Sequence, residues 1–168
     1  MQFKPVKQIS TIIRQQYFEP TISWSLRVVL ALNVPLIVIP FFRGFSYEVI
    51  WAAFGAYMLS LIDYRGLHYK KIIIQVITTV LVVFAALLGM YVAKSVWWSA
   101  LAMFFVGGAV ALIRNWRDYG PSIAVSAGFF FLFGLATPVT FNESLDYSFY
   151  LLAGCGWAIL ITLFSFPF

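Results

Sequence analysis

Two side chains that can bind anions or polar groups stand inside an apolar stretch near the start of the chain, "SWSLRVVLALNVPLIV" at residues 23–38. Arg27 carries a guanidinium, whose planar fork binds carboxylates through paired hydrogen bonds. Asn33 follows six residues later, and Pro35 removes a backbone hydrogen bond next to it. The freed carbonyl of Ala31 and the Asn33 amide would then leave a polar spot within the stretch. We therefore take Arg27 and Asn33 as candidate substrate-binding residues.

Two further arginines, Arg114 and Arg117, share one helical face at the end of another apolar run. Together with Arg27 they would place three guanidiniums at one mouth, where a cluster of like charges concentrates counter-ions such as carboxylates. The alternative readings are structural. Arg27 would extend to lipid phosphates, Arg114 would pair with Asp118 one turn away, and Asn33 would bond to a neighbouring helix.

The rest of the chain is far too apolar for a water-soluble domain. Its 168 residues are 62% hydrophobic and only 10% charged, with a mean hydropathy of +0.92. Soluble domains average about 25% charged residues, and a globule of this size leaves much of its surface outside the core. The sequence therefore predicts an integral membrane protein.

Six apolar runs approach or reach the roughly 20 residues that a helix needs to cross a bilayer. They cover residues 22–42, 47–62, 72–93, 96–113, 121–139 and 147–168. A β-barrel would instead show strands of about ten residues that alternate apolar and polar side chains. The predicted class is thus all-α, with a six-helix transmembrane domain at residues 22–168. Residues 1–21 are predicted to form a cytoplasmic arm with a short amphipathic helix at the interface.

The basic residues predict the orientation, because they concentrate on the cytoplasmic side of membrane proteins. One side of the predicted bundle carries most of them: Lys4, Lys7, Arg14, Arg65, Lys70, Lys71, Arg114 and Arg117. The other side carries only Arg43 and Lys94, and its last loop, "PVTFNESLDY", is acidic. Both termini are therefore predicted to be cytoplasmic, in a bacterial inner membrane. This asymmetry accounts for most of the net charge of +5 and disfavours a nucleic-acid partner.

Nothing in the sequence indicates an enzyme. His68 is the sole histidine and Cys155 the sole cysteine, and no nucleophile, phosphate-binding or metal-binding motif is present. We therefore predict no catalytic residue, no cofactor and no metal. Cys155 is predicted to be a small packing residue.

Polar and small residues within the spans predict a tight bundle. The polar residues expected to bond to neighbouring helices, besides Asn33, are Gln75, Thr78, Thr79, Ser122 and Ser126. The small residues form pairs at four-residue spacing: Ala52 with Ala56, Gly107 with Ala111, Ala124 with Gly128, and Gly154 with Ala158.

Three stretches of the chain resemble one family of membrane proteins. They are "SWSLRVVLALNVPLIV", the segment "WAAFGAYMLSLIDYRG" that precedes a basic stretch, and the closing "GWAILITLFSFPF". From about Ser23 onward the chain resembles the N-terminal six-helix membrane half of the fusaric-acid resistance and aromatic-acid exporter family.

The resemblance implies a transport function. Members are thought to carry out efflux of aromatic and other organic carboxylates, some together with a periplasmic adaptor. Many contain two six-helix halves, each followed by a soluble domain, and the similar plant malate channels are dimers of one six-helix unit. We therefore expect an organic-anion substrate, and either a homodimer or pairing with a second six-helix half.

The sequence also allows two functions other than transport. The bundle would serve as a non-transporting scaffold that assembles or anchors a partner, or, least favoured, as an intramembrane enzyme. All six carboxylates fall at helix ends or outside the predicted spans. Because a proton-coupled carrier usually keeps an ionisable relay within the membrane, this distribution favours passive, channel-like permeation over coupled transport.

Overall fold

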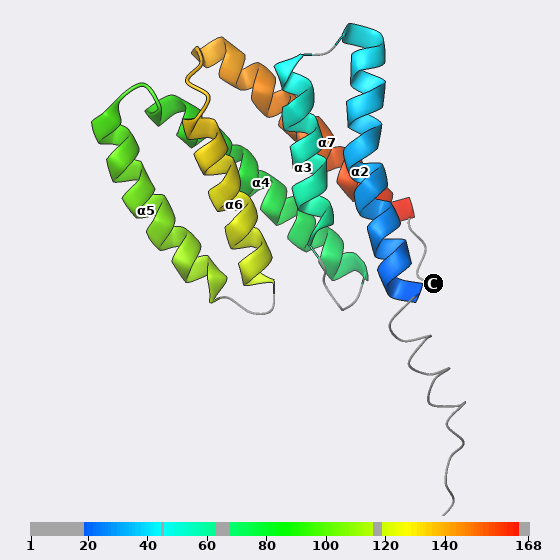
Figure 1. Ribbon diagram of the computed structural model, residues 1–168. Helices are drawn as coiled ribbons and strands as arrows, with labels where there is room; N and C mark the ends of the chain where they lie inside the picture. Colours follow the sequence, from blue (N-terminus) through cyan, green and yellow to red (C-terminus); the bar gives the residue numbers. More distant parts are fainter. Residues whose placement is uncertain (1–18, 45, 63–67, 116–118, 165–168) are drawn as a thin grey trace, which may run out of the picture.

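A computed structural model describes residues 19–44, 46–62, 68–115 and 119–164, and within these residues every regular element is a helix. The six helices are α2 (Glu19–Arg43), α3 (Tyr47–Ser60), α4 (His68–Val92), α5 (Val96–Arg114), α6 (Gly120–Leu135) and α7 (Phe141–Phe164) (Figure 1). The predicted all-α class with six helices is confirmed. The predicted amphipathic arm lies almost wholly outside the described residues, as do the last four residues of the predicted sixth span.

The start of α7 corrects the sequence prediction. The segment from Phe141 to Asp146 was expected to belong to an acidic loop, but it forms the first turns of α7. The backbone N–H of Thr140 donates to the Glu143 carboxylate at 2.8 Å, and so does the Thr140 hydroxyl. A threonine followed three residues later by a glutamate is the capping-box pattern, which satisfies donors at a helix start. The helix therefore begins six residues before the predicted residue 147.

The helix α2 passes without a break through Pro35 and Pro40. It ends at Gly44, which has a φ of +79° and donates its backbone N–H to the carbonyl of Pro40 at 2.9 Å. Glycine adopts this left-handed conformation without a steric penalty, so it is a common stop signal. Pro35 therefore does not split the first helix into two half-helices.

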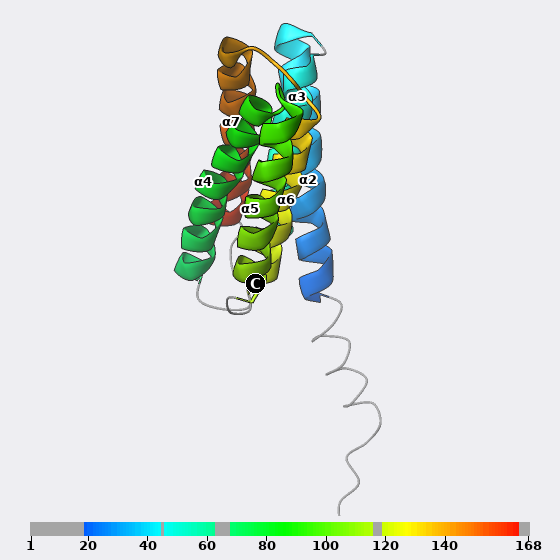
Figure 2. The ribbon, with the colours of Figure 1, turned by 90° about the vertical axis from the view of Figure 1, so that its left-hand side faces the viewer.

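The helices form two layers. The order α5, α6, α3, α2 runs across the front layer in Figure 1, and α4 and α7 cross behind it, as the turned view in Figure 2 shows. The most extensive contacts join the layers, α3 with α7 and α4 with α6. Within the front layer α2 packs on α3 and α5 packs on α6.

The six helices form two similar three-helix units whose helices run in opposite directions. The unit α2–α3–α4 and the unit α5–α6–α7 make corresponding contacts: α2 on α3 matches α5 on α6, and α3 on α7 matches α6 on α4. Because α2 runs upward in Figure 1 and α5 downward, half a turn about the viewing direction brings one unit broadly onto the other. The two three-helix units are therefore related by a pseudo-two-fold axis between α3 and α6 in front and between α4 and α7 behind.

Aromatic rings fill the centre of the front layer, where α3 and α6 meet. The Trp51 ring of α3 lies 4.6 Å from Phe133 and 6.2 Å from Phe130, measured between ring centroids, and Phe54 lies 5.7 Å from Phe129. Trp51 and Phe130 are almost completely buried. These rings join the two units at the axis.

The periphery of the bundle is apolar and open. None of the residues of α5 is buried, and large side chains such as Trp97, Phe104 and Leu112 are more than three-quarters exposed. Four helices, α2, α4, α5 and α7, are long and apolar enough to cross a membrane. A water-soluble surface would not carry so much contiguous apolar area.

Candidate functional site

The first predicted site residue, Arg27, lies on α2 eight residues after the helix start and is partly buried. At 1.5 Å per residue this places it about 12 Å along the helix. It therefore lies well inside the helix. At such a position a guanidinium needs either a hydrogen-bonding partner or a side chain that extends to the polar membrane interface. The position suits both the anion-binding and the interface-anchor interpretation.

The second predicted site residue, Asn33, is exposed on α2, and its amide bonds within its own helix. Its Nδ2 donates to the carbonyl of Val29 at 2.8 Å, one turn earlier. Six residues separate it from Arg27, which is a rotation of about 240° around the helix, so the two side chains occupy different faces. The structure does not bring Asn33 and Arg27 together.

Arg114 ends α5 and is exposed, whereas Arg117 lies outside the described residues. The C-terminal end of α5 and the N-terminal end of α2 lie at the same end of the bundle, as Figures 1 and 2 show. They are, however, at opposite edges of the front layer. A shared mouth for Arg27 and Arg114 therefore does not form within one copy of the chain.

The two shortest helices occupy corresponding positions in the inverted units. α3 has 14 residues and α6 has 16, whereas the other four have 19 to 25. Unusually short segments at matching positions of two inverted repeats are a pointer to the binding site in transporters, because their ends stop within the membrane. This directs attention to what lies at the end of α3.

A buried amide bridges three helices at that end. Gln75 of α4 is fully buried, and its Nε2 donates to the Thr162 hydroxyl of α7 at 3.1 Å and, more weakly, to the carbonyl of Leu59 in α3 at 3.4 Å. Thr162 in turn donates to the carbonyl of Ala158 at 3.0 Å. We call Gln75, Leu59 and Thr162 the amide node.

The amide node has one unused acceptor. The Oε1 atom of Gln75 is buried and has no hydrogen-bond partner, although buried polar atoms are nearly always paired. An amide oxygen accepts hydrogen bonds but donates none. It can therefore bind a water molecule or a protonated carboxyl group, but it has no attraction for a carboxylate oxygen.

The prediction of inter-helix bonds is wrong for Thr78 and Ser126, which bond within their own helices, whereas the Thr79 side chain also has a hydrogen bond with Cys155 of α7. Thr78 donates to the carbonyl of Ile74, Thr79 to that of Gln75, and Ser126 to that of Ser122. All these partners lie one turn earlier in the same helix. Short hydroxyl side chains reach their own backbone first, whereas the longer glutamine reaches across to other helices.

Reciprocal glycine contacts join the two inter-layer pairs. A methyl group added at Gly154 of α7 would collide with the carbonyl of Ala52 in α3, and one added at Gly55 would lie 3.0 Å from the carbonyl of Leu151. The same exchange occurs between α4 and α6, where Gly89 meets the carbonyl of Phe131 and Gly134 meets that of Ala86. In every case the contacted carbonyl belongs to the residue three positions before the partner glycine. The two crossings are thus built alike, as the pseudo-two-fold axis requires.

Comparison of the chain with protein families, with curated proteins and with solved structures gives no match.

Proposed function

We propose that the chain is a membrane transport domain through which organic carboxylates leave the cytoplasm. The observation that carries this proposal is the pair of inverted three-helix units with a short helix in the same place of each. Many transporters are built from inverted repeats, with the substrate site between the repeats near the middle of the bilayer. A scaffold that only anchors a partner has no need of such an arrangement.

In this proposal the helices cross a bacterial inner membrane. The length and composition of the four long helices support a membrane-spanning placement. The two short helices pack against these longer neighbours. At 1.5 Å per residue α3 is about 21 Å long and α6 about 24 Å, less than the roughly 30 Å of the hydrocarbon core. Both therefore end at a depth where polar groups need protein partners, as the Leu59 carbonyl has in Gln75.

The substrate class rests on the cationic end of the bundle and on the family resemblance. Arg27 and Arg114 lie on helices whose ends share one side of the bundle, and the basic-residue rule assigns that side to the cytoplasm. Cations at the entrance would raise the local concentration of organic anions. The unused acceptor of Gln75 would then receive a hydrogen bond from a protonated acid inside the bundle.

The experiment is flux of radiolabelled benzoate into vesicles that contain the purified protein. We expect flux above that of protein-free vesicles, reduced in Arg27→Lys and reduced further in Arg27→Gln, because lysine keeps the charge but not the two-pronged guanidinium. Lys70→Gln is the matched control, since Lys70 is an exposed cation near the start of α4, at the same end of the bundle.

Two outcomes would count against the proposal or a part of it. If the wild-type protein carries no more benzoate than protein-free vesicles, the scaffold function replaces transport. If Arg27→Gln inserts normally and carries benzoate at the wild-type rate, Arg27 serves only as an interface anchor.

A further inference from the structure

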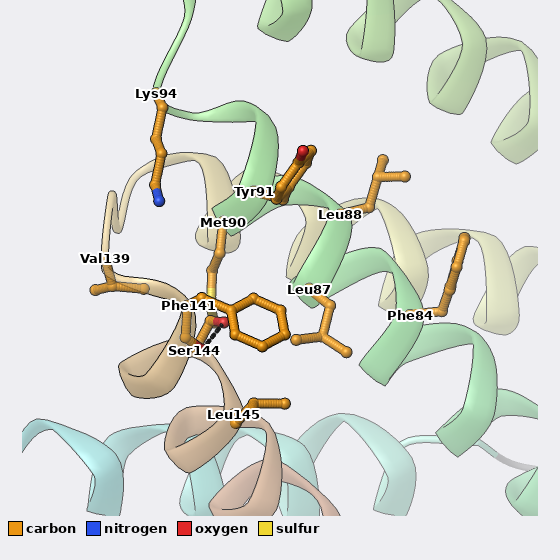
Figure 3. A pocket seen from close by; sticks show the side chains of 10 residues that line it. All are labelled: Phe84, Leu87, Leu88, Met90, Tyr91, Lys94, Val139, Phe141, Ser144 and Leu145. Atoms are coloured by element: carbon orange, nitrogen blue, oxygen red, sulfur yellow. Dashed lines mark hydrogen bonds between the residues drawn. The ribbon is translucent and has the colours of Figure 1, made fainter.

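Two apolar grooves flank the C-terminal end of α4, at the end of the bundle away from the amide node. The first lies between α4 and the beginning of α7 and has a volume of about 360 Å³. Its walls are largely hydrocarbon and aromatic (Figure 3): Phe84, Leu87, Leu88, Met90, Tyr91, Lys94, Val139, Phe141, Ser144 and Leu145. The only hydroxyl among the short side chains, that of Ser144, already donates to the carbonyl of Phe141.

The second groove lies between α4 and α5 and has a volume of about 350 Å³. It is wholly apolar, and its lining comprises Leu88, Val92, Trp98, Leu101, Ala102, Phe105, Val106 and Ala109. Leu88 lines both grooves. They therefore run along the two sides of the same stretch of α4.

A lysine lines the first groove and lies in the turn that joins the two helices flanking the second groove. Lys94 lies in the turn between α4 and α5, its side chain is exposed, and Figure 3 shows its ammonium at one end of the first groove with Phe84 at the other. No carboxylate among the described residues pairs with it. Glu143 lies in the first turn of α7, but it caps that helix and does not line the groove.

The length of each groove matches one leaflet of a bilayer. Eight residues of α4 separate Phe84 from the helix end at Val92, which is about 12 Å, and Lys94 follows two residues later in the turn; eleven residues of α5 separate Trp98 from Ala109, which is about 16 Å. Half of a 30 Å hydrocarbon core is about 15 Å. Two grooves of leaflet depth, with one cation in the turn beside them, have the shape of a lipid with two acyl chains and an acidic headgroup.

We propose that an anionic two-chain lipid of the outer leaflet binds astride the end of α4. Its phosphate pairs with Lys94, one acyl chain lies in the groove toward α7, and the other lies in the groove toward α5. The charge complementarity and the two divergent apolar channels distinguish this occupant from a free aromatic acid, which has a single apolar body. The inference rests on the membrane placement in the proposed function, but not on transport.

Native mass spectrometry of the detergent-solubilised protein tests the headgroup contact. With equal amounts of phosphatidylglycerol and phosphatidylcholine, we expect about a fivefold preference for phosphatidylglycerol, as one lysine at a membrane surface supplies. Lys94→Glu should abolish the preference, and Lys70→Glu, an exposed lysine on the other end of α4, should retain it. An unchanged preference in Lys94→Glu would overturn the proposal.

Groove-filling variants test the acyl chains. Ala109→Phe places a ring in the second groove, and Ala100→Phe places one on an exposed part of α5 outside either groove. We expect weaker phosphatidylglycerol binding only in Ala109→Phe, and weaker binding of single-chain lysophosphatidylglycerol than of the two-chain lipid in the wild type. Equal effects of both alanine variants, or displacement of the lipid by benzoate in a Lys94-dependent way, would refute the two-chain site.

The readouts separate this inference from the proposed function. Lipid retention with no benzoate flux would leave the lipid site standing and remove transport. Benzoate flux in a protein that shows no lipid preference would support transport and refute the lipid site.

Discussion

At the scale of single residues, most polar side chains bond to their own helix, and a few, such as Gln75 and Ser99, reach a neighbouring helix. Asn33 and Thr79 turn back to carbonyls one turn earlier, whereas Gln75 reaches both α3 and α7. Side-chain bonds between helices in membranes average about 0.6 kcal/mol. Gln75 therefore gains little stability from these bonds relative to the cost of burying its amide, and the proposed function gives its Oε1 atom a hydrogen bond from the substrate.

Replacing Gln75 by methionine separates that role from packing. Methionine has a similar volume and no hydrogen-bonding amide, so we expect Gln75→Met to change the free energy of unfolding by about 1 kcal/mol or less. Benzoate flux should fall about tenfold, the value of one lost hydrogen bond of about 1.4 kcal/mol. Stability is measured by denaturation in detergent, and benzoate flux is measured in vesicles.

The matched control is Thr78→Val, because Thr78 is equally buried but bonds only to its own helix. It should keep most of the flux. Wild-type flux in Gln75→Met would assign the amide node a purely structural role.

At the scale of elements, glycines set the distance between the layers. Without a side chain at Gly154 the backbones of α7 and α3 approach to direct contact, and Gly89 and Gly134 do the same for α4 and α6. Helices in a membrane gain stability from such close packing rather than from the hydrophobic effect. The two crossings therefore hold the inverted units together.

A single methyl group should disturb one of these crossings. We expect Gly154→Ala to lower the free energy of unfolding by about 1–3 kcal/mol, because the added carbon meets the Ala52 backbone, which cannot move aside. Gly156→Ala, two residues on, meets no atom within 4 Å and should be neutral or slightly stabilising, since alanine favours a helix by up to about 1 kcal/mol. Thermal unfolding in detergent, followed by circular dichroism, compares the two; equal melting temperatures would show that the crossing tolerates separation.

At the scale of the whole molecule, the orientation of the bundle can be measured by labelling. A cysteine at exposed Asn142, which leaves the Glu143 cap intact, should react with an impermeant thiol reagent in intact cells, and a cysteine at Lys70 should not. The native Cys155 is buried and adds little background. Labelling at position 70 from outside would contradict the cytoplasmic placement of the termini.

The separation of Arg27 and Arg114 at opposite edges predicts an assembly of at least two copies, in which arginines of neighbouring copies share an entrance. The face of α5 around Gly107 and Ala111 is open, with no atom within 4 Å of a methyl group added at Gly107. We expect two steps in single-molecule photobleaching of the labelled protein, and one step when Gly107→Leu blocks the face. One step for the wild type would show that the unit acts alone.

The class and number of the helices were predictable from the amino-acid sequence, because length and apolarity are local properties that each apolar run carries independently. The sequence also singled out Gln75, Gly154 and Ala158, all three of which are buried in the structure. The early start of α7 was readable from Thr140 and Glu143, although the acidic composition of the segment favoured a loop.

Which of these residues contact one another depends on the packing of the helices and could not be predicted. Whether Arg27 lies near Arg114, which small-residue pairs face another helix, and which acceptor stays unpaired all depend on how helices far apart in sequence pack. The inverted relation of α2–α4 to α5–α7 has no counterpart in a repeated motif, because it arises from backbone approach at glycines on different helices. Helix packing is a property of pairs of surfaces, and a single apolar run does not specify its partner.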